Sequence, residues 1–137
     1  MNDDVVMAKL ESLERCVSRI RAKIPRDFAA FTEDLDSQEI IALNLERSVQ
    51  LCVDTALRIL ARAGGPSLPG NMGDAFRRMH ELEMIDEETA SQMVSAVGFR
   101  NISVHSYKDV EPEIVWSILK KDLEVFPRFA RQVLDLL

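Results

Sequence analysis

An arginine, a histidine and a tyrosine lie close together in the stretch FRNISVHSY, residues 99–107. The planar guanidinium of Arg100 can hold the non-bridging oxygens of a phosphodiester and stabilise their charge in a transition state. The imidazole of His105 can move a proton near neutral pH. In RNA the ribose 2′-hydroxyl is itself the nucleophile, so these two side chains are sufficient for cleavage without a metal.

This chemistry requires that the side chains approach one another. If the stretch continues a helix, Arg100 and Tyr107 lie on one side, while Asn101 and His105 share another. Asn101 is then placed to hydrogen-bond the His105 ring and fix its tautomer, and the long Arg100 side chain reaches the same volume. Spacing alone leaves a structural interpretation open, in which Arg100 pairs with an acid and His105 is a hydrogen-bonded residue near a helix end.

The chain that must position these residues carries the spacing of amphipathic helices. A first helix is expected before Pro25, because its apolar residues recur at intervals of three and four. These residues are Val6, Leu10, Leu13, Val17, Ile20 and Ile24. One short helical turn is expected next within RDFAAFTEDLD, residues 26–36, anchored by Phe28 and Phe31.

A second long helix is expected over residues 38–63, capped by Asp36 or Ser37 and ended by the segment GGPSLPG. Beside its broad apolar face runs a polar stripe made of Asn44, Arg47, Asp54 and Arg58. Such a stripe is ordinarily a solvated helix face. The resemblance described below gives it a second interpretation.

Three further helices are expected after this glycine-rich segment, which lacks the pattern of a phosphate-binding P-loop. One covers about residues 74–83, and the next is capped by Asp86 and leads into FRNISVHSY. The last begins at Pro112, and we expect Pro127 to bend it. The sequence therefore predicts an all-α protein, a small up-down bundle of four to five helices in one domain, residues 1–137.

Composition limits the classes of function. The net charge is −6, so attraction to nucleic acid or anionic lipid is not spread over the surface, and any contact with RNA must be local. Cys16 and Cys52 lie in apolar helical stripes, without the Cys and His spacing of a metal site, so we expect buried thiols and no metal or cofactor. The acidic start and the lack of a long apolar run predict a cytoplasmic protein that does not enter membranes.

The segment GFRNISVHSY resembles the R-N-x-x-x-H-x-Y motif of the HEPN superfamily, in particular the HepT toxins of MNT–HEPN toxin–antitoxin modules. Four residues match that motif: Arg100, Asn101, His105 and Tyr107. The resemblance extends to the amphipathic opening helix, to the segment LNLERSVQLCVDTALRIL and to the Pro-led final helix. It therefore covers nearly the whole chain.

The resemblance implies an all-helical homodimer in which two R-x4-H motifs meet in a cleft between subunits. It also implies a metal-independent endoribonuclease toxin, with Arg100 and His105 as its catalytic residues. Its partner would be a cognate MNT-type nucleotidyltransferase antitoxin that transfers AMP from ATP to Tyr107.

In such a dimer the polar stripe could line the cleft. Asp54 would orient Arg100 or His105, and Arg47 would add positive charge for RNA, as would Arg58. Asn44 would lie beside them.

A rival hypothesis from another class is a non-catalytic HEPN module that binds a nucleotide or positions a substrate for a nucleotidyltransferase. Such a module would keep Arg100 but would tolerate a neutral hydrogen-bonding substitute for His105, whereas proton transfer needs the titratable ring. A purely structural helical dimer would need neither residue.

Overall fold

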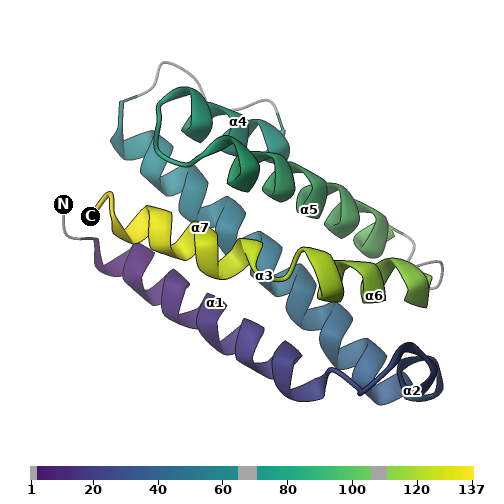
Figure 1. Ribbon diagram of the computed structural model, residues 1–137. Helices are drawn as coiled ribbons and strands as arrows, with labels where there is room; N and C mark the ends of the chain where they lie inside the picture. The colour runs from purple at the N-terminus through teal and green to yellow at the C-terminus, as the bar shows by residue number, and fades with distance from the viewer. Residues whose placement is uncertain (1–2, 65–70, 106–110) are drawn as a thin grey trace.

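The computed structural model describes residues 3–64, 71–105 and 111–137, with only the backbone described for residues 101–105, and these ranges form seven α-helices and no strand (Figure 1). The helices are α1 (Asp4–Lys23), α2 (Phe28–Glu33), α3 (Leu35–Arg62), α4 (Met72–Glu81), α5 (Glu87–His105), α6 (Pro112–Lys121) and α7 (Val125–Leu134). The all-α prediction is confirmed. The helices number seven rather than four to five, because the short turn is a helix of its own and the final helix is two.

One hydrophobic cluster holds the helices together, and it takes buried side chains from all seven of them. The most extensive contacts join α1 to α3 and α4 to α5. The largest side chains that are fully buried include four phenylalanines: Phe31, Phe76, Phe126 and Phe129. Phe76 of α4 and Phe129 of α7 meet edge to face, with ring centroids 5.7 Å apart. The packing fixes α5, which carries the motif, against α3, α4 and α7.

The first residues of α3 differ from the expectation. The cap is Asp34, not Asp36 or Ser37, and the helix begins at Leu35 instead of Gln38. The Asp34 carboxylate accepts from the backbone N–H of Ser37 at 3.0 Å and from its hydroxyl at 2.7 Å. Ser37 therefore stabilises the cap from inside the first turn, where its backbone N–H needs an acceptor.

The turn from α4 to α5 brings the motif helix back along its neighbour. Glu83 has a φ of +60°, and the N–H of Met84 donates to the carbonyl of Met79 at 2.9 Å, which closes the end of α4. Asp86 then caps α5 by accepting from the N–H of Thr89 at 2.8 Å, as predicted.

The carboxyl-terminal part of the chain is not one bent helix. The chain turns at residues 122–124, between α6 and α7, and Pro127 lies inside the first turn of α7. Backbone N–H groups in the first turn have no acceptor within the helix, so a proline there removes no helical hydrogen bond. The prediction that Pro127 bends the helix is therefore wrong.

An aromatic contact joins α2 to α6. The Trp116 ring lies 5.4 Å from the ring of Phe31 and 6.0 Å from that of Phe28, measured between centroids. On the same indole, the ammonium of Lys120 lies 4.8 Å from the ring centroid, within the range of a cation–π interaction. The helix that follows the motif is thus anchored on α2.

Two predictions about composition can be compared with this structure. Cys16 and Cys52 are buried and free, as expected, and burial raises the pKa of the Cys52 thiol, which keeps it protonated. Among the described residues, no helix combines the length and the apolar composition needed to cross a bilayer.

Candidate functional site

The described part of the motif, up to His105, lies on α5, which is continuous to that residue. Arg100, Asn101 and His105 therefore belong to one helix, as the proposed chemistry requires. Four residues apart on that helix, Asn101 and His105 share a side of it. Tyr107 lies outside the described residues.

The Arg100 side chain is half-buried between α5 and α4. Its Nη1 donates to the Sδ of Met72, the first residue of α4, at 3.6 Å. A thioether is a weak acceptor, and a guanidinium carries five N–H donors. This contact therefore leaves Arg100 with donors that can bind an anion.

Sequence reasoning missed Glu46, a half-buried acid of α3 that interacts electrostatically with Arg100. Burial raises the pKa of the Glu46 carboxyl, and the positive charge of Arg100 opposes that rise. The sequence feature that could have identified Glu46 is its position at the border of the apolar face of α3, directly after the buried Leu45. A charged residue at such a border commonly meets a charge on the neighbouring helix.

The polar stripe of α3 has contacts of its own. Asn44 is buried, its Nδ2 donates to the Ile40 carbonyl at 2.8 Å, and its Oδ1 has no hydrogen-bond partner in the described part of the chain. Asp54 is half-buried and accepts from Gln50 at 2.8 Å, while Arg47 is exposed. Within the described residues of one chain, no hydrogen bond or ion pair links these side chains to Arg100.

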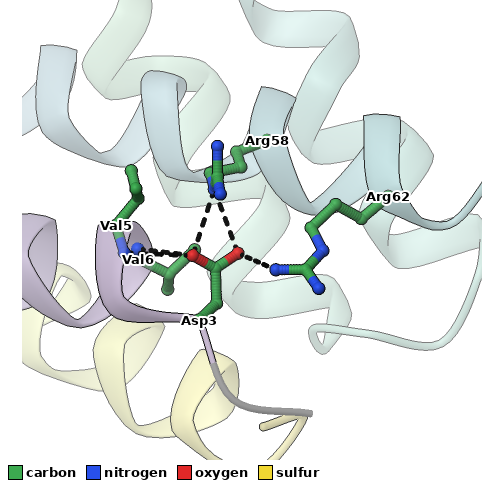
Figure 2. Close-up of polar contacts among 5 residues, drawn as sticks. All are labelled: Asp3, Val5, Val6, Arg58 and Arg62. Atoms are coloured by element: carbon green, nitrogen blue, oxygen red, sulfur yellow. Dashed lines mark hydrogen bonds and ion pairs between the residues drawn. The ribbon is translucent and has the colours of Figure 1, made fainter.

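Arg58, the fourth residue of the stripe, binds the start of α1 instead (Figure 2). Its Nε lies 3.0 Å from one carboxylate oxygen of Asp3 and 3.1 Å from the other, and Arg62 binds the same carboxylate at 2.6 Å. Burial would raise the pKa of Asp3, but hydrogen bonds from Arg58, the Val6 N–H and Arg62 together hold it well below its usual range.

This charge cluster is distant from the motif. In Figure 1 the amino end of α1 and the carboxyl end of α5 lie at opposite sides of the bundle. Arg58 therefore stabilises the contact between α1 and α3, and the expectation that it adds charge beside Arg100 is wrong.

Two other kinds of site bear on the chemistry. Within the part of the chain that the structure describes, no three His, Cys, Asp or Glu side chains are grouped to hold a metal ion.

A groove of about 390 Å³ runs between α1 and α7, and its lining includes Leu10, Val17, Phe126 and Leu134 but no residue of the motif.

Known proteins resemble this chain over nearly its full length. Residues 13–133 match the HepT-like family, described as ribonuclease HepT-like. The mRNA nuclease HepT of Shewanella oneidensis is 29% identical over 127 residues, which are 93% of this chain and 94% of that protein. The tRNA nuclease HepT of Aphanizomenon flos-aquae is 22% identical over 129 residues, 94% of this chain and 87% of that protein.

A solved structure agrees with these sequence relatives. The tri-AMPylated HEPN toxin of Shewanella oneidensis, solved in complex with an MNT antitoxin, superposes with a TM-score of 0.89 at 27% identity. The superposition covers 98% of this chain and 99% of that one. Since the family match spans most of the sequence and includes Arg100, Asn101, His105 and Tyr107, the chain belongs to the HepT-like ribonuclease family.

Proposed function

We propose that this protein is the toxin of a toxin–antitoxin module and cleaves RNA as a metal-independent endoribonuclease in the cytoplasm. The observation that carries the proposal is the unbroken course of α5 from Arg100 to His105 in a chain of the HepT-like family. Relatives named as mRNA and tRNA nucleases support RNA as the substrate.

In the proposed reaction the ribose 2′-hydroxyl attacks the adjacent phosphorus, and the bond to the 5′-oxygen breaks. His105 transfers the proton in this exchange, and Asn101 fixes its tautomer. Arg100 stabilises the charge that develops on the non-bridging oxygens. The products are a 2′,3′-cyclic phosphate and a free 5′-hydroxyl.

The proposed site is completed by a second copy of the chain. In a homodimer with the motifs facing one cleft, two guanidiniums and two imidazoles can act on one phosphate. Arg47 is exposed and can add local positive charge, and Asp54 can orient a motif residue of the facing chain. Local charge of this kind reconciles an acidic protein with an anionic substrate.

The proposed inhibitor is an MNT-type nucleotidyltransferase that attaches AMP to Tyr107. The solved relative that is AMPylated and bound to an MNT antitoxin supports this partner. An AMP on the tyrosine hydroxyl would place a phosphodiester charge and a nucleoside two residues beyond His105. That group competes with RNA for the Arg100 guanidinium.

The test compares Arg100→Ala and His105→Ala with the parent on bulk tRNA and on a transcribed mRNA. Each variant should lose at least about a hundredfold in cleavage rate with little change in melting temperature. His80→Ala is the matched control, because His80 is the other of the two histidines and its Nδ1 lies 3.2 Å from the Ile85 carbonyl, outside the motif. Full cleavage by either motif variant would contradict the proposal.

Two further measurements separate the mechanism from its rivals. Cleavage should persist in EDTA, and activity that is lost in EDTA and restored by magnesium would contradict the metal-free mechanism. His105→Gln should bind RNA but not cleave it, because glutamine hydrogen-bonds without titrating. Cleavage by His105→Gln would contradict proton transfer by this residue.

A further inference from the structure

Met72 is the α4 residue that contacts Arg100, and it lies at the edge of the core. Asn71 caps α4 by accepting from the N–H of Asp74 at 3.0 Å, which fixes the first turn in which Met72 lies. The Met72 side chain is half-buried and packs against the hydrophobic cluster. Met72 is therefore held beside Arg100 and is still within reach of a small solute.

The contact between these two side chains pairs a strong donor with a weak acceptor. Nη1 of Arg100 donates to the Sδ of Met72 at 3.6 Å, and a thioether accepts only weakly. A bidentate grip on a phosphate uses two adjacent N–H groups of the guanidinium. The sulfur gives up its N–H readily, whereas a stronger acceptor in the same place would compete with RNA for that group.

The thioether of methionine becomes a stronger acceptor in one covalent step. Hydrogen peroxide transfers one oxygen atom to the sulfur, which is oxidised by two electrons to the sulfoxide, and the peroxide is reduced to water. The sulfoxide makes an apolar side chain polar, and its oxygen accepts hydrogen bonds. In Met72 that oxygen would be bonded to the atom that Nη1 of Arg100 already contacts.

The other described methionines differ from Met72 in exposure or in position. Met79 and Met93 are fully buried, so the core protects them from a solute. Met7 of α1 and Met84, in the turn between α4 and α5, are half-buried like Met72. Neither of these two is hydrogen-bonded to Arg100 within the described residues, so they are matched controls for Met72.

We propose that Met72 is an oxidation site through which a peroxide lowers the activity of Arg100, an inference that rests on the proposed ribonuclease function. In the reduced protein the guanidinium is available to a phosphate. In the oxidised protein the added oxygen holds Nη1 against α4. The sulfoxide sulfur is chiral, so the inhibited form is the epimer whose oxygen faces the guanidinium. Reduction of the sulfoxide restores RNA cleavage.

The kinetic test compares RNA cleavage by each full-length protein before and after hydrogen peroxide, with tRNA and mRNA as substrates. Treatment should lower kcat/KM of the parent about fivefold or more, and methionine sulfoxide reductases with dithiothreitol should restore it. Met72→Leu should keep its own untreated rate, because leucine has a similar volume but no sulfur. Met7→Leu and Met84→Leu should stay as sensitive as the parent. An equal loss in Met72→Leu would overturn the inference, as would a parent that keeps its rate while mass spectrometry finds Met72 oxidised.

A second variant tests the same contact without an oxidant. Met72→Gln brings an amide oxygen to the guanidinium, which has donors only, so the oxygen and not the amide nitrogen should face it. Untreated Met72→Gln should have a lower kcat/KM than untreated Met72→Leu, and Met84→Gln should not differ from Met84→Leu. Equal rates for the two Met72 variants would overturn the inference.

A spectroscopic test does not depend on RNA cleavage. The side-chain Nε–Hε resonance of Arg100 in ¹⁵N-labelled protein can be assigned from its absence in Arg100→Lys. Peroxide should move this resonance in the parent and leave it in place in Met72→Leu. A resonance that oxidation of Met72 does not move overturns the inference even if the protein cleaves RNA. If the resonance moves but the reduced parent cleaves no RNA, the contact stands and the ribonuclease function fails.

Discussion

Asp3 has two stabilising roles, because its buried carboxylate both caps a helix and binds two arginines. It caps α1 by accepting from the N–H groups of Val5 and Val6, each at 3.1 Å, and it binds Arg58 and Arg62 of α3 (Figure 2). The Asp3 side chain is only 2% exposed while both arginines are partly exposed, so salt screens this cluster less than it screens a fully exposed ion pair. The start of α1 is thereby fixed to the end of α3.

We predict that Asp3→Asn lowers the free energy of unfolding and that this loss depends on pH. The pKa of Asp3 is lowered in the folded state, so the stabilisation is complete above the ordinary aspartate pKa of about 3.9. It is lost as the pH falls through the folded-state value. Urea unfolding should therefore show a large difference between parent and variant at pH 7 and a smaller one at pH 3. Asp4→Asn is the control, because the neighbouring Asp4 is exposed; a parent-to-variant difference that grows at pH 3 would contradict the prediction.

Tyr107 provides a prediction about regulation. Tyr107→Phe keeps the aromatic ring but lacks the oxygen that would accept AMP, so this variant should stay toxic when the antitoxin is present. Mass spectrometry of the parent, co-expressed with its antitoxin, should find added AMP units on the peptide that contains Tyr107. An inhibited but unmodified parent, or a Tyr107→Phe variant that is neutralised equally well, would show that inhibition is by occlusion.

The sequence motif singles out candidate catalytic residues but does not predict what surrounds them. Arg100 and His105 are predicted as catalytic residues because arginine and histidine at this spacing match a recognisable motif. Glu46 was not predicted, because what distinguishes it from other acids of α3 is its position beside a neighbouring helix. The spacing of residues along one helix does not predict which residues of another helix lie next to it. Arg58 was assigned to the wrong end of the bundle for the same reason, since its partner Asp3 is 55 positions away in the chain.

At the scale of elements, the turn between α4 and α5 stores strain at Glu83. A residue with a side chain at a φ of +60° is about 1 kcal/mol less favourable than glycine. We predict that Glu83→Gly raises the free energy of unfolding by about 0.5 to 1 kcal/mol. Gly64→Ala should have the opposite effect and lower the free energy of unfolding, because Gly64 has a φ of +76°, which is unfavourable for alanine. A loss of stability in Glu83→Gly would mean that the glutamate side chain contributes more than its backbone costs.

Helix existence was more predictable than helix ends. Periodicity identified α1, α3 and α5, because their apolar residues must face one core. Asp34 was overlooked because Asp34, Asp36 and Ser37 lie within four positions and any of them has a side chain that can cap a helix. The carboxylate that becomes the cap is the one whose oxygen reaches the backbone N–H groups of the first turn. The prediction of a bend at Pro127 failed because proline is also compatible with the first turn of a helix. Pro127 lies near the start of α7 and does not bend it.

At the scale of the whole molecule, we predict a homodimer that places two motifs in one cleft. Light scattering at micromolar concentration should give twice the mass of one chain, and Arg100→Ala should keep that mass, since the variant removes charge and leaves the fold intact. A monomer at this concentration would contradict the shared cleft. A dimer that persists while Arg47→Glu loses RNA binding would support the cleft as the place where local charge offsets the acidic surface.

The aromatic contact between α2 and α6 has an optical consequence. The chain has one tryptophan, Trp116, and its indole is packed against Phe28 and Phe31 and lies under the Lys120 ammonium. Its fluorescence therefore comes from a single known position, four residues after Pro112 at the start of α6. Emission that shifts to longer wavelength reports water reaching this contact. The native protein thus contains its own probe for any rearrangement that separates α6 from α2, without an added dye.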